Sequence, residues 1–237
     1  MTNVINYNND KGLLAYIKFL ADKALQLGTG DPEPVFNFEN ALDQTEIAQL
    51  AVNELKKNPQ INALFAERWL PAAFNLDDLA KLPEGTLGNV FAREMKIRGF
   101  DPDFYQKVPV VDDISYLKML WRSTHDIYHV VAGFDTDGIG ELGLQAFILA
   151  QTPIPISVML VSFGMVIISL YQPTKFSDLM TEIARGYSLG SHTPEKFIAQ
   201  KWDQLWDVPV SEIRSRLGMS NGKNSAPRSQ KSELISG

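Results

Sequence analysis

The run from Leu142 to Thr174 constrains the fold most, because it contains no charged residue and no histidine. A run of that length is sufficient to cross a bilayer. However, Pro153 and Pro155 interrupt it, and Gln145 adds a polar group. Lys175 is the only basic residue close by, whereas a membrane span usually has basic flanks. A central buried helix pair therefore explains the run better than a spanning helix. An apolar groove for a lipid or prenyl tail is a third interpretation, which composition does not separate from the helix pair.

Helical periodicity extends over nearly all of the chain. Apolar residues recur at three- and four-residue steps, and capping residues stand at helix ends, as Thr86 and Gly99 do. We therefore predict an all-α fold: a single-domain multi-helix bundle over residues 1–219 with a central apolar helix pair. A flexible polar tail follows over residues 220–237. Outside the charge-free run, helices are expected over residues 11–28, 43–59, 61–70, 86–99, 112–133, 177–190 and 194–206, with a short last helix beginning at Pro209.

Charge and cysteine content exclude several functions. The 237 residues carry a formal net charge of −6 without any Lys/Arg-rich run, which argues against a nucleic-acid-binding surface. The chain has no cysteine, which excludes disulfides, Cys-ligated zinc and thiol catalysis. The first residues resemble neither a secretory signal nor a transit peptide, so we expect a cytoplasmic protein.

The segment "HDIYHVVAGFDTDGIGE", from His125 to Glu141, holds two of the three histidines. At about 100° per residue, His125 falls within the apolar stripe of its helix, and His129 lies about 40° away. Both imidazoles therefore point inward, where the i, i+4 spacing lets them share one ion. Gly133 can end this helix, and a helical hairpin would return Glu141 to the histidine pair. Two imidazoles and one or two carboxylates suit zinc, iron or manganese.

The same residues also fit an ordinary helical core. A histidine on an apolar face is usually a hydrogen-bonded core residue, and Asp126 could pair with Arg122 one turn earlier. Glu141 could simply favour the start of its helix. Against this, Glu141 opens the charge-free run, where an unpaired carboxylate is costly to bury. The spacing favours the metal site and leaves the structural pairing open.

Two known classes of metal hydrolase do not fit. Zinc proteases carry glutamate after the first histidine, where this chain has Asp126. Phosphohydrolases of the HD type need a further histidine upstream and an aspartate downstream. The remaining histidine, His192, lies far downstream instead.

Several segments resemble the coenzyme Q biosynthesis protein 4 family. Residues 125–141 fit its pattern of His-Asp-x-x-His, eleven residues, then Glu. The resemblance covers residues 75–219 well and the N-terminal third loosely. The metal motif with its flanks is specific to this family, whereas the Pro-Glu-Gly-Thr segment alone would be weak evidence for it. In chain order, the other similar segments are "LPEGTLGNVFAREM", "VDDISYLKMLWRSTHD", "GELGLQAFILAQTPIPISVMLVSFG" and "KWDQLWDVPVSEIRSRLGM".

The resemblance implies an all-helical, peripheral membrane protein of quinone biosynthesis that belongs to a multi-enzyme complex. It implies a scaffold that binds polyprenyl quinone intermediates, and also a metal-dependent oxidative decarboxylation at the ring carbon bearing the carboxylate. The implied metal ligands are His125, Asp126, His129 and Glu141. Asp126 and Glu141 are the candidate catalytic residues, with Asp126 better suited to be a base or an orienting group than a ligand. The expected cofactor is a divalent metal: zinc first, with iron, manganese or magnesium as alternatives.

The charge-free run is expected to hold the prenyl tail, because each buried methylene contributes about 0.8 kcal/mol. Expected partners are a prenylated aromatic acid or quinone-like lipid, other quinone-biosynthesis proteins, the inner face of a membrane, and a second copy of the chain in a homodimer. The residues expected to bind the lipid are Leu144, Phe147, Ile148, Ile156, Leu160 and Phe163.

Two departures from the family pattern bear on function. The Arg-rich tract before the motif is reduced to Arg122, and the absence of a mitochondrial presequence favours a bacterial setting, so the exact quinone stays open. The first functional hypothesis is a metal-dependent C1 decarboxylase of a prenylated 4-hydroxybenzoate. The second is a non-catalytic lipid-binding scaffold, in which the metal only holds two helices together. A metal hydrolase ranks third, because no phosphate-binding glycine loop supports it.

Overall fold

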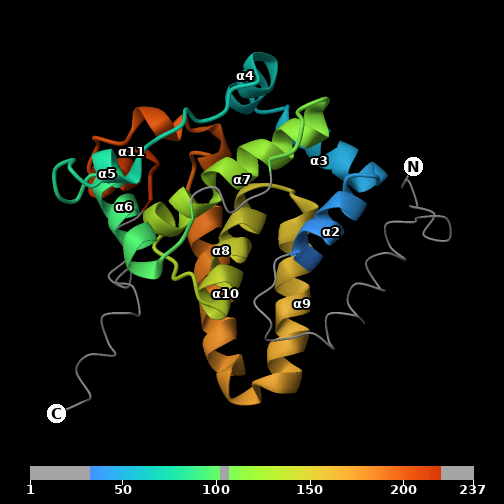
Figure 1. Ribbon diagram of the computed structural model, residues 1–237. Helices are drawn as coiled ribbons and strands as arrows, with labels where there is room; N and C mark the ends of the chain where they lie inside the picture. Colours follow the sequence, from blue (N-terminus) through green and yellow to red (C-terminus); the bar gives the residue numbers. More distant parts are fainter. Residues whose placement is uncertain (1–32, 102–106, 220–237) are drawn as a thin grey trace, which may run out of the picture.

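The computed structural model describes residues 33–101 and 107–219 (Figure 1). Within these ranges every regular element is a helix, which confirms the all-α prediction, and the β-type pairing is one bridge between Thr86 and Pro209. The expected helix over 11–28, the loop around Pro102 and the tail 220–237 lie outside the described residues. The α-helices are α2 (Glu33–Leu42), α3 (Glu46–Leu55), α4 (Pro59–Glu67), α5 (Leu76–Leu79), α6 (Leu87–Arg98), α7 (Asp113–Ala132), α8 (Gly138–Gln151), α9 (Pro155–Tyr171), α10 (Phe176–His192) and α11 (Val210–Arg216).

Helix α7 supplies a large part of the hydrophobic core, and Tyr116 and Leu120 on it are completely buried. It begins at a capping box, in which the Asp112 side chain accepts from the Ser115 backbone N–H and the Ser115 hydroxyl accepts from Asp112 N–H. It ends at Gly133, whose φ of 73° is the left-handed conformation that favours glycine. These are the ends that the sequence predicted, and they fix the start of the turn into α8.

Helix α8 is enclosed by its neighbours, with α10 packed closely along it (Figure 1). Glycines allow this approach: a Cβ on Gly186 of α10 would lie 2.0 Å from the carbonyl oxygen of Gly143 of α8. A Cβ on Gly190 would lie 2.4 Å from the carbonyl oxygen of Phe147. Because α10 holds α8 at this distance, it also fixes the position of the first turn of α8, where Glu141 lies.

The charge-free run forms most of α8 and all of α9, which are separated at the Pro153–Pro155 turn. The two helices differ in burial: Leu144 and Phe147 of α8 are inaccessible, whereas α9 exposes Val166 and Leu170. In Figure 1, α9 and α10 form a hairpin that extends away from the other helices. No helix within the described residues has the length and apolar character required to cross a bilayer.

The prediction of a helix over residues 194–206 is wrong. The segment instead forms two 3-10 turns, η3 (Phe197–Ala199) and η4 (Trp202–Gln204). Its backbone groups are taken by side chains: the Phe197 N–H donates to the Gln151 amide oxygen at 2.9 Å, and the Trp202 indole donates to the Phe197 carbonyl at 3.1 Å. Burial of the Phe197 and Trp202 rings therefore outweighs the helical periodicity of this segment.

Two smaller differences occur before α6. The second expected helix ends at Leu55 rather than at Pro59, and Pro59 instead begins α4, where its fixed φ suits the first helical position. Asn58 caps α4 by accepting from the backbone N–H groups of Gln60 and Ile61. The α2 helix was not expected from the sequence.

Candidate metal centre

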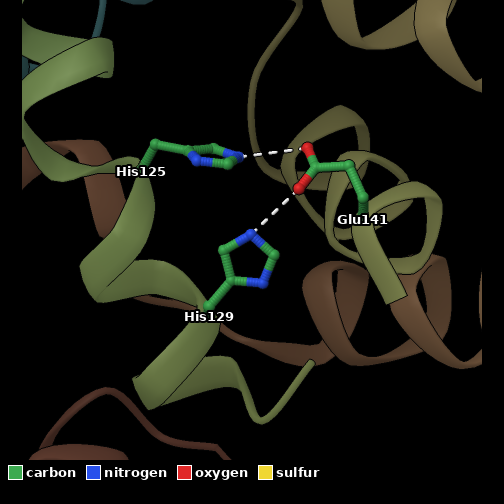
Figure 2. A group of neighbouring side chains, drawn as sticks. All are labelled: His125, His129 and Glu141. Carbon is green, nitrogen blue, oxygen red and sulfur yellow. Dashed lines mark hydrogen bonds and ion pairs between the residues drawn. The ribbon is translucent and has the colours of Figure 1, made fainter. Parts of the chain in front are cut away.

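Two histidines of α7 and a glutamate of α8 converge at the α7–α8 hairpin, as Figure 2 shows. Nε2 of His125 lies 3.2 Å from Oε1 of Glu141, and Nε2 of His129 lies 2.9 Å from Oε2. One potential ligand atom from each residue lies within 4.8 Å of the others. Both histidines are buried, while the Glu141 side chain is 34% exposed. The predicted hairpin thus brings Glu141 back to the histidine pair.

Local sequence features create this convergence. The i, i+4 spacing places both imidazoles on one face of α7. Asp137 caps α8 by accepting from the Gly140 N–H at 2.7 Å. The turn is tight enough that a Cβ on Gly140 would lie 2.2 Å from the Asp135 carbonyl oxygen, so a glycine is required immediately before Glu141. Glu141 therefore enters α8 in its first turn, facing α7.

Each histidine also has an acceptor on its second ring nitrogen. Nδ1 of His129 lies 3.2 Å from the Phe134 carbonyl oxygen, and Nδ1 of His125 lies 3.4 Å from Oδ1 of Asp126. A proton on Nδ1 would be stabilised by these acceptors, which leaves the Nε2 lone pair facing Glu141. Metal-binding histidines are commonly oriented in this way. Asp126 contacts the opposite edge of the His125 ring from Glu141, so its position suits an orienting carboxylate.

The charges of the three residues stabilise one another. Burial alone raises the pKa of Glu141, but the charge and hydrogen bonds of His125 and His129 outweigh it and hold that pKa well below its ordinary value. Burial alone lowers the pKa of His125, but Glu141 and Asp126 outweigh it and raise that pKa. The cluster therefore already pairs a carboxylate with positive charge, and a divalent cation would supply that charge more strongly.

Two imidazole nitrogens and a carboxylate form a donor set that fits zinc and other divalent transition metals. The three residues are close enough to bind one ion after small adjustments of their side chains. His125, His129 and Glu141 are therefore the residues that would hold it. Three protein ligands leave coordination positions for a substrate or water.

The Glu141 carboxylate has a polar partner that the sequence pattern did not predict. The amide nitrogen of Gln145 donates to Oε1 of Glu141 at 2.8 Å, and the Ser157 hydroxyl donates to the Gln145 amide oxygen at 2.7 Å. Both residues are completely buried. Gln145 follows Glu141 by four residues, a spacing that places the two on one helix face. This spacing was the available signal for Gln145, whereas nothing local in the sequence pairs it with Ser157.

A cavity of about 410 Å³ borders the cluster at His129 and Asp126. Its volume suits a small aromatic molecule, since ligand pockets occupy about 300–1,000 Å³. Arg214 lines it and donates to the Val131 carbonyl oxygen at 2.7 Å, and among the described residues no carboxylate pairs with this guanidinium. The other lining residues include Phe91, Met95, Arg98, Val130 and Phe134.

The six residues predicted to bind a lipid fall into two groups. Leu144, Phe147, Ile148 and Ile156 are buried in the hydrophobic core, so a lipid would reach them only after a rearrangement. Leu160 and Phe163 on α9 are partly exposed. Lipid binding by these residues stays a prediction.

The fold and the site together define an all-helical protein with a two-histidine, one-glutamate cluster at a helical hairpin. The chain belongs to the coenzyme Q (ubiquinone) biosynthesis protein Coq4 family, whose profile matches residues 43–222. This confirms the family predicted from the residues around His125. The match includes all the residues of the candidate metal centre.

Individual relatives agree with this assignment. The mouse mitochondrial ubiquinone biosynthesis protein COQ4 homolog is 27% identical over 173 residues, which make up 71% of this chain and 64% of the mouse protein. The mitochondrial ubiquinone biosynthesis protein coq4 of Aspergillus fumigatus is 31% identical over 143 residues, 60% of this chain and 49% of that protein. The chain thus matches less than two thirds of the length of these relatives.

A solved structure is also similar. The crystal structure of a "putative ubiquinone biosynthesis protein" from Nostoc punctiforme superposes with a TM-score of 0.83 and is 77% identical in sequence. The similarity covers 90% of this chain and 98% of that chain. The two proteins therefore share one fold over nearly the whole length of the Nostoc chain.

Proposed function

We propose that this protein binds a divalent metal and a prenylated lipid in ubiquinone-type quinone biosynthesis, where it acts in the oxidative decarboxylation of a prenylated hydroxybenzoate. The observation that carries the proposal is the convergence of His125, His129 and Glu141 beside a cavity. Membership of the Coq4 family supports the pathway. Zinc is the first candidate metal, with iron, manganese and magnesium as alternatives.

In the proposed reaction, the bond between the ring carbon and its carboxyl carbon breaks and carbon dioxide leaves. Dioxygen is the oxidant and supplies one oxygen atom as the new ring hydroxyl. Two electrons from an external reductant, together with protons, convert the other oxygen atom to water. The divalent metal would stabilise the negative charge of the carboxylate and the neighbouring phenol oxygen.

The residues of the chain would bind and orient the substrate. His125, His129 and Glu141 would hold the metal next to the cavity, and Asp126 would orient His125 or accept a proton from the ring hydroxyl. Phe91 and Phe134 give that cavity apolar walls suited to an aromatic ring. These apolar side chains would also limit access of water to the ring carbon.

In this proposal, α9 contacts the prenyl tail and the membrane. The helix exposes Val158, Val166 and Leu170, with 65% of Leu170 accessible. This apolar surface suits a lipid tail or the inner face of a membrane, to which the protein would attach peripherally. The same surface suits a homodimer, and other quinone-biosynthesis proteins would be further partners.

A non-catalytic lipid-binding scaffold is the second candidate. The observation that favours it is the helix-linking geometry of the cluster, because a metal bound there would join α7 to α8 without any reaction. Exposed apolar residues on α9 suit a protein that presents a lipid to other enzymes.

One experiment separates the two candidates. The metal-loaded protein is incubated with a prenylated 4-hydroxybenzoate, a reductant and dioxygen, and release of the labelled carboxyl carbon is measured. The enzyme is expected to release carbon dioxide, and Glu141→Ala to abolish the release. Lipid binding without any release by the wild type would leave only the scaffold.

A further inference from the structure

We propose that Gln145 and Ser157 form a buried hydrogen-bond chain that positions Glu141 for metal binding. The inference rests on the proposed metal site and assigns two further residues to it. The chain runs from the Ser157 hydroxyl on α9, through the Gln145 amide on α8, to Oε1 of Glu141. Both bonds have ordinary hydrogen-bond lengths, 2.7 Å and 2.8 Å, and Gln145 and Ser157 are completely buried.

The chemistry of the three groups fixes the direction of the chain. A carboxylate oxygen only accepts, so the Gln145 group that faces Glu141 has to be the NH₂ donor. The amide oxygen then points away and needs a donor of its own. Ser157 supplies this donor, because its hydroxyl can rotate toward the amide. A buried amide with one end unsatisfied would be costly, so both partners are needed together.

The chain also distinguishes the two oxygens of Glu141. Oε1 accepts from Gln145 at 2.8 Å and also lies 3.2 Å from Nε2 of His125, whereas Oε2 has no bond from Gln145 and lies 2.9 Å from Nε2 of His129. A carboxylate that binds a metal through one oxygen is commonly hydrogen-bonded at the other. Gln145 therefore holds Oε1 and presents Oε2 to the ion. In this arrangement Gln145 is a positioning residue that does not touch the metal.

Other polar residues of the charge-free run do not share this role. Ser162 and Ser169 donate to backbone carbonyls one turn earlier in α9, at Val158 and Met165. Gln151, on α8 like Gln145, donates to the carbonyls of Gly190 and Thr193 and accepts from Phe197. Its bonds hold the segment after α10. Among the described residues, the bonded path from this run to the cluster passes through Gln145.

The position of Ser157 gives the chain a further consequence. Ser157 lies in the first turn of α9, directly after the Pro153–Pro155 turn. The hydrogen bonds therefore connect the metal ligand Glu141 to the helix that exposes the apolar surface. A shift of the first turn of α9 would move Ser157 and so change the hydrogen bond from Gln145 to Oε1. Metal affinity is consequently tied to the placement of α9.

The test compares the same substitution at two glutamines of α8, using the full chain. The dissociation constant for Zn²⁺ is measured by competition with a chromophoric chelator for the wild type, Gln145→Met and Gln151→Met. Loss of such a hydrogen-bond partner typically weakens metal binding about 10–100-fold. That weakening is expected for Gln145→Met, whereas Gln151→Met should bind Zn²⁺ like the wild type. Thermal unfolding of the metal-free variants separates lost stability from lost affinity.

Ser157→Ala provides a milder variant, which should weaken Zn²⁺ binding in the same direction by a smaller factor. If Gln145→Met does not fold, Ser157→Ala decides the question. Unchanged affinity in a folded Gln145→Met or Ser157→Ala variant would overturn the positioning role, and so would equal weakening by Gln151→Met. Failure of the wild type to bind any divalent ion would instead overturn the metal site on which the proposed function depends.

Discussion

Nε2 of His129 lies 2.9 Å from Oε2 of Glu141, although the two residues belong to different helices. The α7–α8 turn creates this contact, because Gly133 ends α7 and Asp137 caps α8 within a few residues. The contact joins an imidazole and a carboxylate at a distance that one ion can bridge. Two consequences can be tested separately: the ion binds there, and the two groups stabilise each other without it.

Purified protein is expected to contain about one divalent ion per chain. His129→Ala and Glu141→Ala should lose it, because two ligands seldom hold a zinc-type ion. Elemental analysis after dialysis against metal-free buffer checks this. His192→Ala is the matched control, since this third histidine is exposed and its Nδ1 lies near the Ser188 carbonyl instead. Equal metal content in the His129→Ala and His192→Ala proteins would contradict the site.

The metal-free protein should show a pH-dependent contribution from the same residues. The pKa of Glu141 is held below its ordinary value of 4.5, so its contribution to stability is present above pH 4.5 and is lost as the pH falls through the folded-state pKa. The pKa of His125 is raised above 6.5, so its contribution is complete below pH 6.5 and is lost as the pH rises through its folded-state pKa. The combined contribution of Glu141 and His125 to stability is therefore greatest in the window between pH 4.5 and pH 6.5.

Urea unfolding of the metal-free wild type and of Glu141→Gln, from about pH 4 to about pH 9, measures this contribution. The difference in free energy of unfolding should be largest in the window and shrink on both sides. Metal binding should have the opposite dependence on the alkaline side, because an ion requires neutral histidines and binds more tightly as the pH rises. A pH-independent difference would refute the assigned pairing.

The close approach of α8 and α10 should make Gly186 sensitive to substitution. A Cβ there would lie 2.0 Å from the Gly143 carbonyl oxygen, so Gly186→Ala has to separate the two helices. We expect a loss of about 1–3 kcal/mol in the free energy of unfolding, as is typical of overpacking. Gly138→Ala is the control, because a Cβ at Gly138 meets no atom within 4 Å. Chemical denaturation of both variants measures this loss. Equal free energies of unfolding would show that α8 and α10 can separate without loss of stability.

Local patterns predicted the helices and the hairpin because these depend on neighbours in sequence. The Asp112 cap, the Gly133 end and the inward-facing histidines follow from helix periodicity and capping chemistry. The failures have long-range causes. The segment 194–206 is not a helix because its backbone donates a hydrogen bond to Gln151 and because Trp202 is buried. No local pattern reveals either contact.

The candidate site divides in the same way. His125, His129 and Glu141 were predicted, since their spacing places them on the facing sides of a hairpin. The contribution of Gln145 depends on a serine twelve residues away in another helix, so it requires the tertiary structure. Phe147 was predicted to bind lipid, and its burial likewise depends on how α10 covers α8.

The apolar surface of α9 should mediate attachment to membranes. Val166→Glu combined with Leu170→Glu places two charges on residues that are 55% and 65% exposed, where the fold itself is little affected. The variant should float less with liposomes than the wild type at low salt. Leu50→Glu is the control, because Leu50 is 57% exposed on α3. Flotation that is unchanged by the α9 substitutions, or reduced as much by Leu50→Glu, would remove α9 from the membrane contact.

Arg214 should determine whether the cavity beside His129 prefers an acid. Burial and the neighbouring Arg185 lower the pKa of Arg214, which means that its positive charge is incompletely compensated. An anionic group in the cavity would compensate the positive charge of Arg214. Charge-assisted hydrogen bonds contribute about 1.5–3 kcal/mol, so Arg214→Gln should weaken binding of 4-hydroxybenzoate by roughly ten- to a hundredfold.

Isothermal titration of the metal-loaded protein with 4-hydroxybenzoate and with phenol checks this expectation. Phenol lacks the carboxylate, so Arg214→Gln should leave its affinity unchanged. Arg98→Gln tests the specificity of the effect, because Arg98 lines the same cavity but already donates to Glu94 and Asp135. Since those carboxylates compensate its charge, Arg98→Gln should weaken acid binding less than Arg214→Gln does. Equal loss of acid and phenol binding in Arg214→Gln would mean that this residue shapes the cavity without recognising the acid.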